Sequence, residues 1–201
     1  MQREPAPFDR ADREDDRLFY AAARKVTHIE AGAIEALRRR YAELLQPNGD
    51  VLDLMSSWRS HLPDRLGRVT GLGMNEAEMA DNPQLDDIVI HDLNAEPLLP
   101  FGDAAFDAVV CAVSVQYMTS PIGVWRDVRR VLRPGGVAVV SFSNRCFPTK
   151  AVNLWMSTGD KGHRLIVRRY FEEAGFLSVA DEQLPSSDDP IFVVHGRRPP
   201  M

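Results

Sequence analysis

The sequence is poor in cysteine and has no long apolar run. It holds 2 cysteines, Cys111 and Cys146, in 201 residues, too few for a disulfide framework or a cysteine-rich metal site. No stretch reaches the roughly 18 apolar residues that a membrane-spanning helix requires. We therefore expect a protein of a reducing compartment, with both cysteines as small residues of the core and no membrane partner.

Positive charge is also in short supply. Lysine and arginine number 24 against 29 aspartates and glutamates, which gives a net charge of −5. Such a chain repels a nucleic-acid backbone unless its basic residues gather on one face, so we expect no nucleic-acid partner. With 44% hydrophobic and 26% charged residues, the composition is typical of a folded globular domain and excludes a disordered chain.

The first 17 residues mix both charges densely and include Pro5 and Pro7. They carry too little apolar surface to offset the entropy lost on ordering, and they lack the apolar stretch of a secretory leader. The sequence predicts a charged, flexible arm over residues 1–17, a single domain over residues 18–201 and a cytoplasmic location.

Helix-like and strand-like segments alternate along the rest of the chain. Thr27 and Glu30 form a capping-box pattern at the start of an amphipathic helix, and the apolar run Val51–Met55 is typical of a buried parallel strand. Further strands are predicted at 69–74, 88–91, 106–115, 137–142, 177–184 and 191–195, and further helices at 75–80, 121–133 and 163–175. Because parallel strands need helical crossovers, this order predicts an α/β fold. We expect a Rossmann-like, doubly wound, mostly parallel sheet with an antiparallel last strand.

Polar side chains follow the predicted strands at one edge of this sheet. In such sheets the ligand binds beyond the carboxyl ends of the strands, where the strand order reverses. Asp53 lies inside an apolar strand, where an unpaired carboxylate is costly, so it requires either a ligand or a structural partner. Ser56 and Ser57 follow it, and serine at this point serves either as a helix cap or as a ligand contact.

Five histidines are present, and none stands at metal-ligand spacing from another, so no metal site is expected. His28 is a candidate functional residue because it follows Tyr20 and Arg24 at intervals of four residues. These three side chains share one face if the predicted helix extends backwards over them. The alternative is a docking helix with Arg24 in solvent.

Two strings carry a family resemblance. The run LLPFGDAAFDAVV at 98–110 and the run RVLRPGG at 130–136 together resemble class I S-adenosylmethionine-dependent methyltransferases of the small-molecule type. The resemblance covers roughly residues 51–176. It implies S-adenosyl-L-methionine as cofactor, a small molecule as methyl acceptor, and a last strand antiparallel to the others.

The resemblance also implies where the cofactor lies. The first loop of the family is usually rich in glycine, which lets the backbone approach the methionine part, but here it reads Met55, Ser56 and Ser57. The second strand normally ends in an acid that holds both ribose hydroxyls. Gly73 stands at that position, and Asn75 is the replacement acceptor that we predict.

The third strand keeps the family pattern best. Asp92 matches the carboxylate near the adenine amino group, and Arg24 would pair with the cofactor carboxylate if residues 18–28 close as a lid. His28 and Tyr117 are the candidate catalytic residues, as groups that help remove a proton from the acceptor. The predicted cofactor-binding residues are Arg24, Asp53, Met55, Ser56, Ser57, Gly73, Met74, Asn75, Asp92, Leu93, Asn94 and Ser114.

The missing loop glycines and the missing ribose acid leave a second hypothesis open, a non-catalytic module that keeps the fold for binding or regulation. A nicotinamide-dependent oxidoreductase is disfavoured, because no G-x-G-x-x-G string follows the first strand. Capping and packing interpretations also stay open for Asp53, Ser56, Ser57, Asp92 and Tyr117.

Overall fold

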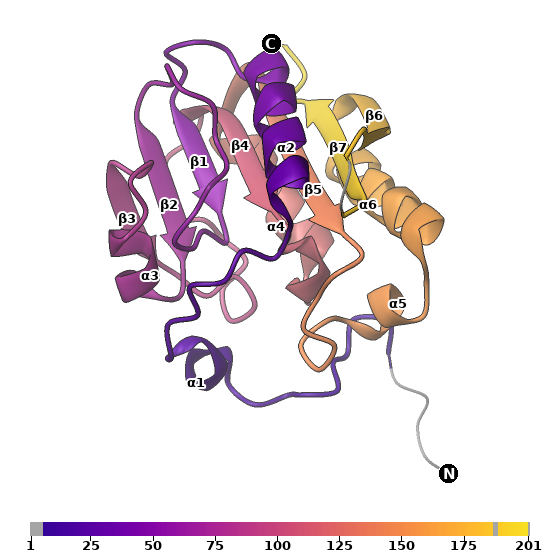
Figure 1. Cartoon of the computed structure of the whole chain (residues 1–201). Helices are drawn as coiled ribbons and strands as arrows, with labels where there is room; N and C mark the ends of the chain where they lie inside the picture. Colours follow the sequence, from indigo (N-terminus) through magenta and orange to yellow (C-terminus); the bar gives the residue numbers. More distant parts are fainter. Residues whose placement is uncertain (1–5, 187–188, 201) are drawn as a thin grey trace.

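The computed structural model describes residues 6–186 and 189–200. Seven strands form one sheet in the order β3-β2-β1-β4-β5-β7-β6, and helices cover both of its faces (Figure 1). The strands are β1 Val51–Leu54, β2 Val69–Gly73, β3 Asp87–Ile90, β4 Phe106–Ala112, β5 Leu132–Ser143, β6 Leu177–Leu184 and β7 Ile191–Arg197. The helices are α1 Asp16–Tyr20, α2 Ala31–Leu44, α3 Glu76–Ala80, α4 Pro121–Val131, α5 Asn153–Met156, α6 Asp160–Ala174 and the 3₁₀ turn η1 Val115–Tyr117.

The strand directions decide where a ligand can bind. β1 pairs in parallel with β2 and β4, and these pair in parallel with β3 and β5. β7 runs antiparallel to both β5 and β6. The predicted doubly wound, mostly parallel sheet with an antiparallel last strand is therefore confirmed. Because the strand order reverses between β1 and β4, the ligand crevice of such sheets lies at their carboxyl ends.

The inner strands β1, β2 and β4 are buried on both faces, which explains their continuous apolar runs. Successive residues of β1 belong to different cores: Val51 packs on the α2 side, and Leu52 packs on the side of α4 and α6. Trp125 of α4 is fully buried, with its ring centroid 4.8 Å from that of Phe171 in α6. Cys111 is also fully buried, as expected for a core residue.

α2 begins later than the capping-box pattern indicates. Its N-cap is Glu30, and no side chain caps the helix there. The Glu30 N–H donates to Asp189 at 2.8 Å, and the Glu30 carboxylate pairs with Arg145 at 3.1 Å. Both groups that a capping box needs are therefore bound to residues far away in the sequence. Residues 21–30 are not helical, so the backward extension of the helix that would align Tyr20, Arg24 and His28 on one face does not occur.

The described part of the N-terminal arm lies along the loop after β5. Arg10 forms an antiparallel bridge with Val152, and four backbone hydrogen bonds of 2.8–3.0 Å also involve residues 6–12, three of them to residues 149–154. This placement differs from the flexible arm predicted for residues 1–17. Residues 1–5 of that arm lie outside the described residues.

A buried lysine explains the placement of this segment. Lys150 is 0% exposed, and its ammonium lies 3.1 Å from Asp12 and 3.0 Å from Asp16. Arg10 also pairs with Asp16 at 2.8 Å. A buried charge is tolerated only with partners of opposite sign, and the acidic residues that made this segment look solvated supply them. These ion pairs are formed by charged side chains, so a count of apolar residues does not detect them.

Candidate functional site

A cavity lies at the carboxyl ends of the parallel strands. Its walls come from the loops after β1, β2, β3, β4 and β5, from α3, and from the N-terminal segment that passes below the strand ends in Figure 1. All of the predicted site residues line it: Arg24, His28, Asp53, Met55, Ser56, Ser57, Gly73, Met74, Asn75, Asp92, Leu93, Asn94, Ser114 and Tyr117. Parallel strands bring their carboxyl ends to one edge, and this brings together residues from distant parts of the sequence.

Asp53 finds its partners inside the loop that follows it. The side chain is buried, and its Oδ2 accepts hydrogen bonds from the hydroxyls of Ser56 and Ser60, both at 2.6 Å. Burial raises the pKa of Asp53 to about 6, although the two hydroxyls act in the opposite direction. The carboxyl group therefore organises the loop after β1 from beneath.

This loop keeps a left-handed residue although it contains no glycine. Met55 directly follows β1 and has a φ of 58°, a conformation that costs a residue with a side chain about 1–2 kcal/mol. The next residue, Ser56, donates its N–H to the Leu72 carbonyl at 2.8 Å, which brings the loop onto the end of β2. Val113, after β4, also has a positive φ of 45°. Such strained residues concentrate at ligand sites.

Asp92 and Asn94 differ in the groups that they leave free. Oδ1 of Asp92 accepts two backbone N–H groups, at 2.9 and 3.2 Å, and no described residue donates to its other oxygen. The Asn94 amide is fully used, since it donates to Asp16 and the Tyr117 carbonyl and accepts two hydrogen bonds from Thr119. In this structure Asn94 joins walls of the cavity, whereas Asp92 presents a free carboxylate oxygen.

Asn75 acts as the cap of α3. Its side-chain oxygen accepts the Glu78 N–H at 2.9 Å, and its nitrogen donates to the carbonyls of Tyr20 at 2.8 Å and Ala21 at 3.3 Å. This arrangement differs from the predicted role as a hydroxyl acceptor, because the amide oxygen is taken by the helix. Asn75 ties α3 to the N-terminal segment.

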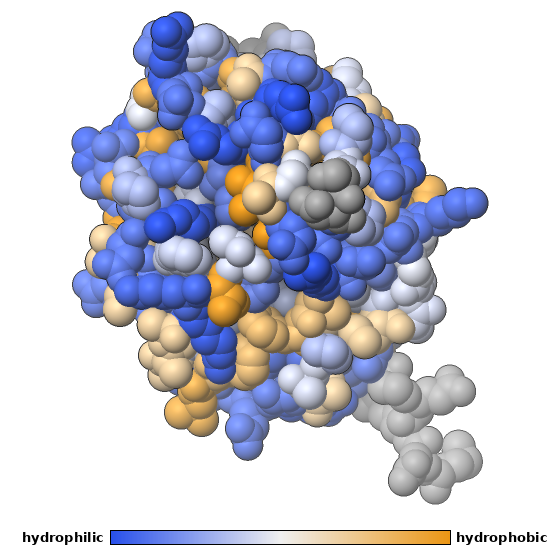
Figure 2. All heavy atoms as spheres, in the orientation of Figure 1, coloured by the Kyte–Doolittle hydropathy of each residue, from blue (hydrophilic) through white to orange (hydrophobic). Residues whose placement is uncertain are grey.

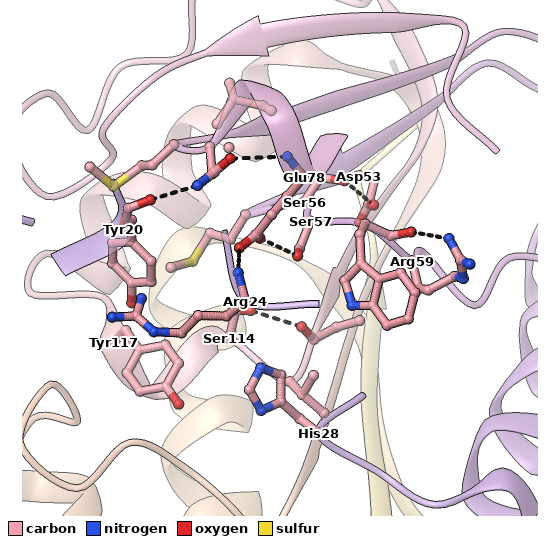
Figure 3. A pocket seen from close by; sticks show the side chains of 18 of the residues that line it. Tyr20, Arg24, His28, Asp53, Ser56, Ser57, Arg59, Glu78, Ser114 and Tyr117 are labelled. Atoms are coloured by element: carbon pink, nitrogen blue, oxygen red, sulfur yellow. Dashed lines mark hydrogen bonds between the residues drawn. The ribbon is translucent and has the colours of Figure 1, made fainter. Parts of the chain in front are cut away.

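Glu78 of α3 lines the cavity but is not among the site residues predicted from the sequence. Its carboxylate turns away from the cap and into the cavity (Figure 3). Oε1 accepts the backbone N–H of Arg24 and Oε2 accepts the Ser57 hydroxyl, both at 2.5 Å. One carboxylate thus joins α3, the N-terminal segment and the loop after β1.

Aromatic rings form another wall. Phe147, from the loop after β5, lies with its ring centroid 5.5 Å from Phe19, 5.1 Å from His28 and 6.0 Å from Tyr117. Neither Phe147 nor Phe19 is among the site residues predicted from the sequence, because an aromatic residue in a loop gives no signal that distinguishes a binding role from packing. Their shared contacts place an apolar surface beside His28 and Tyr117.

The two candidate catalytic side chains are electrically neutral near pH 7. Burial lowers the pKa of His28, and the nearby Glu78 only partly offsets this. Burial also raises the pKa of Tyr117 to about 12. The Tyr117 hydroxyl accepts the Phe147 N–H at 2.8 Å, whereas no described residue hydrogen-bonds the ring nitrogens of His28. His28 therefore has a ring nitrogen available as a base.

Arg24 reaches the cavity from the non-helical segment before α2. Its guanidinium lies 4.3 Å from the centre of the Phe19 ring and donates to the Phe19 carbonyl at 2.6 Å. No described acid pairs with this guanidinium. Arginine carries five N–H donors, so donors remain for an anionic ligand.

The surface near α1 and the loop after β5 is apolar. Hydrophobic residues gather in the lower part of Figure 2, where Figure 1 shows these segments. Leu18 of α1 is 71% exposed, and Val26 is 52% exposed although it also lines the cavity. The rim of the cavity is therefore partly hydrophobic.

Neither a membrane span nor a metal centre occurs in the part of the chain that the structure describes. No helix within residues 6–186 and 189–200 combines the length and the apolar character needed to cross a bilayer. Over the same ranges, no three or more histidine, cysteine, aspartate or glutamate side chains are grouped as metal ligands.

Comparison with known families identifies the fold. Residues 56–140, from the loop after β1 to the middle of β5, match the family described as a methyltransferase domain. This matched segment makes up less than half of the chain and is similar to methyltransferase domains. The cavity lies at the edge where the strand order reverses, and the matched segment contains its loops after β1, β2, β3 and β4.

Two curated relatives and one solved structure give the range of similarity. The chain is 32% identical over 119 residues to the ubiquinone/menaquinone biosynthesis C-methyltransferase of Hahella chejuensis, covering 59% of this chain and 43% of that protein. It is 28% identical over 138 residues to the sterol 24-C-methyltransferase of Gibberella zeae, covering 60% and 36%. The chain thus spans less than half the length of these relatives. The putative methyltransferase of Haloferax volcanii, solved with its Trm112 activator, has the same fold, with a TM-score of 0.62, 17% identity and coverage of 85% and 91%.

Proposed function

We propose that this protein transfers the methyl group of S-adenosylmethionine to a small-molecule acceptor. The observation that carries the proposal is the cavity itself, in which every residue predicted for the cofactor and the chemistry lines one space at the switch point of the sheet. The match of residues 56–140 to a methyltransferase domain supports the same activity.

The groups left free in the cavity fit the two ends of such a cofactor. Asp92 has a carboxylate oxygen that no described residue occupies, which suits the adenine amino group. Arg24 has guanidinium donors without an acidic partner, which suits a carboxylate. Gly73, at the end of β2, lines the same cavity.

The protein orients the cofactor and the acceptor, excludes water and supplies a group that accepts a proton. When bound, the cofactor would supply a methyl group on a sulfonium for transfer to the acceptor atom. His28 is neutral and lies beside Tyr117 and Phe147, so its free ring nitrogen can take the proton that the acceptor loses. The aromatic wall excludes water from this side of the cavity.

The acceptor that this wall favours is a small molecule with an apolar or aromatic part. Tyr20, Tyr117 and Phe147 line the cavity, and the exposed Val26 stands at its rim. Phe19 packs against Tyr20 and Phe147. The names of the two curated relatives refer to ubiquinone/menaquinone biosynthesis and to a sterol. This agreement supports an acceptor of the same general character.

Isothermal titration with S-adenosylhomocysteine tests the proposal directly. We expect saturable binding by the wild-type protein and at least tenfold weaker binding by Arg24→Ala, which removes a charge-assisted contact. Arg39→Ala is the matched control, because Arg39 lies on the exposed side of α2. The absence of measurable binding by the folded wild-type protein would contradict the proposal.

A non-catalytic binding module is the second candidate, and two observations favour it. Met55 replaces a loop glycine in a left-handed conformation, and Gly73 replaces the ribose acid. Such a module binds S-adenosylhomocysteine, but it does not consume S-adenosylmethionine in the presence of quinol-like acceptors. Turnover with any member of an acceptor panel, lost in His28→Ala while cofactor binding persists, would decide for the enzyme.

A further inference from the structure

The end of β2 has no room for an acidic side chain. A Cβ atom at Gly73 would lie 2.4 Å from the Ser56 carbonyl oxygen and 3.0 Å from the Met79 sulfur. The first neighbour is backbone, and the hydrogen bond from the Ser56 N–H to the Leu72 carbonyl fixes it there. The absence of an acid at the end of β2 is therefore coupled to the unusual loop after β1, because this loop occupies the space that a side chain at position 73 would need.

A different carboxylate is directed into the same part of the cavity. Glu78 lies on α3, directly after β2, and its side chain is held between the Arg24 N–H and the Ser57 hydroxyl. The N-terminal turn of α3 is fixed by Asn75, whose amide binds both Glu78 and the Tyr20 carbonyl. Glu78 is thus positioned by the fold, unlike an acid on an exposed helix surface.

The other carboxylates around the cavity are bound by other residues or lie at the end of a different strand. Asp53 binds two serine hydroxyls beneath the loop, and Asp16 is held by Arg10, Lys150 and Asn94. Asp92 lies beyond β3. A carboxylate offers about four lone-pair sites, of which Glu78 uses two for one N–H and one O–H donor. Two sites remain for a second pair of donors.

We propose that Glu78 binds the ribose hydroxyls of the cofactor, in place of an acid at the end of β2. A vicinal diol offers two O–H donors at short separation, which match the two oxygens of one carboxylate. This inference rests on the proposed function, since it presumes a ligand with a ribose. It also makes Glu78 a contact between the ribose and the N-terminal segment, because the same carboxylate holds the Arg24 backbone.

A comparison of two ligands on two proteins tests the assignment. Titrations use the full chain with 5′-methylthioadenosine, which has the ribose diol, and with its 3′-deoxy analogue. For the wild-type protein we expect about 10-fold or greater loss of affinity on removal of the hydroxyl, as for a hydrogen bond to a charged group. For Glu78→Gln we expect weaker binding of the diol ligand and a difference between the two ligands of less than about threefold.

The matched control is Glu76→Gln, which removes an exposed acid from the same turn of α3 and should keep the wild-type difference between the ligands. If Glu78→Gln weakens both ligands equally, the carboxylate acts only through the loop and the assignment fails, while the proposed function stands. The wild-type protein alone is also decisive: a loss below twofold for the deoxy ligand would mean that no group holds the hydroxyl. If the wild-type protein binds neither ligand nor S-adenosylhomocysteine, the proposed function itself fails.

Discussion

The buried carboxyl group of Asp53 should make the stability of this protein depend on pH in a measurable way. Its pKa rises from 3.8 to about 6 in the folded chain, chiefly because burial disfavours the charge. At about 1.36 kcal/mol per pKa unit, this difference corresponds to about 3 kcal/mol of destabilisation when the group is ionised. The side chain is only 2% exposed, so solvent screening reduces this value little.

The sign follows from where the proton is bound. Between pH 4 and pH 6 the folded chain keeps the proton on Asp53, whereas the unfolded chain has released it. The free energy of unfolding therefore falls as the pH rises through this window, and the loss is complete above the folded pKa. Other carboxyl groups titrate in the same range, so the wild-type protein alone does not isolate the effect.

The variant Asp53→Asn isolates the contribution of this carboxyl group to the pH dependence of stability. Asparagine keeps an oxygen that can accept from Ser56 and Ser60, but it carries no charge at any pH. Urea unfolding of both proteins at pH 4.5 and pH 8 gives the difference in their free energies of unfolding. We expect Asp53→Asn to gain about 2 kcal/mol relative to wild type between the two pH values, because only the wild type develops the buried charge.

The comparison of Asp53→Asn with wild type at two pH values can also refute the argument. Any penalty of the amide that does not depend on pH cancels between the two measurements. Exposed Asp64→Asn is the control, and its difference from wild type should stay constant with pH. A free-energy difference between Asp53→Asn and wild type that is equal at both pH values, within about 0.5 kcal/mol, would refute the argument that burial dominates at this carboxyl group.

Three further predictions concern the cavity walls. Asp92→Ala should weaken S-adenosylhomocysteine binding by about 1–3 kcal/mol, and unchanged affinity in titration would remove Asp92 from the site. Asn75→Ala should lower the free energy of unfolding by about 1 kcal/mol, because the helix cap and the tether to Tyr20 are lost; an unchanged urea midpoint would argue against the cap. Hydrogen exchange across residues 18–28 should slow when S-adenosylhomocysteine binds, since Arg24 gains a partner and the segment tightens, and identical exchange with and without ligand would reject the lid.

The fold was determined by local features of the sequence. Apolar runs such as Val51–Leu54 and the helix that begins at Pro121 follow from side-chain periodicity and from turn residues, each of which acts within a few positions. Their alternation requires crossovers and hence parallel strands, and parallel strands bring Asp53, Gly73 and Asp92 to one edge. The location of the cavity was therefore predictable before any coordinates.

The partner of each polar group was decided only by tertiary structure. Arg24 and Glu78 are separated by 54 residues and meet through one hydrogen bond, and no spacing rule connects them. The same is true of the buried Lys150, which pairs with Asp16 of a segment whose charged residues predict exposure to solvent. It is also true of Glu30, whose N–H donates to Asp189 and not to a residue of its own helix. The periodicity of apolar residues indicates which side of a helix or strand is buried. The hydrogen-bond partner of a polar group is the group that the packed chain brings near it, and this choice depends on the other contacts in the fold.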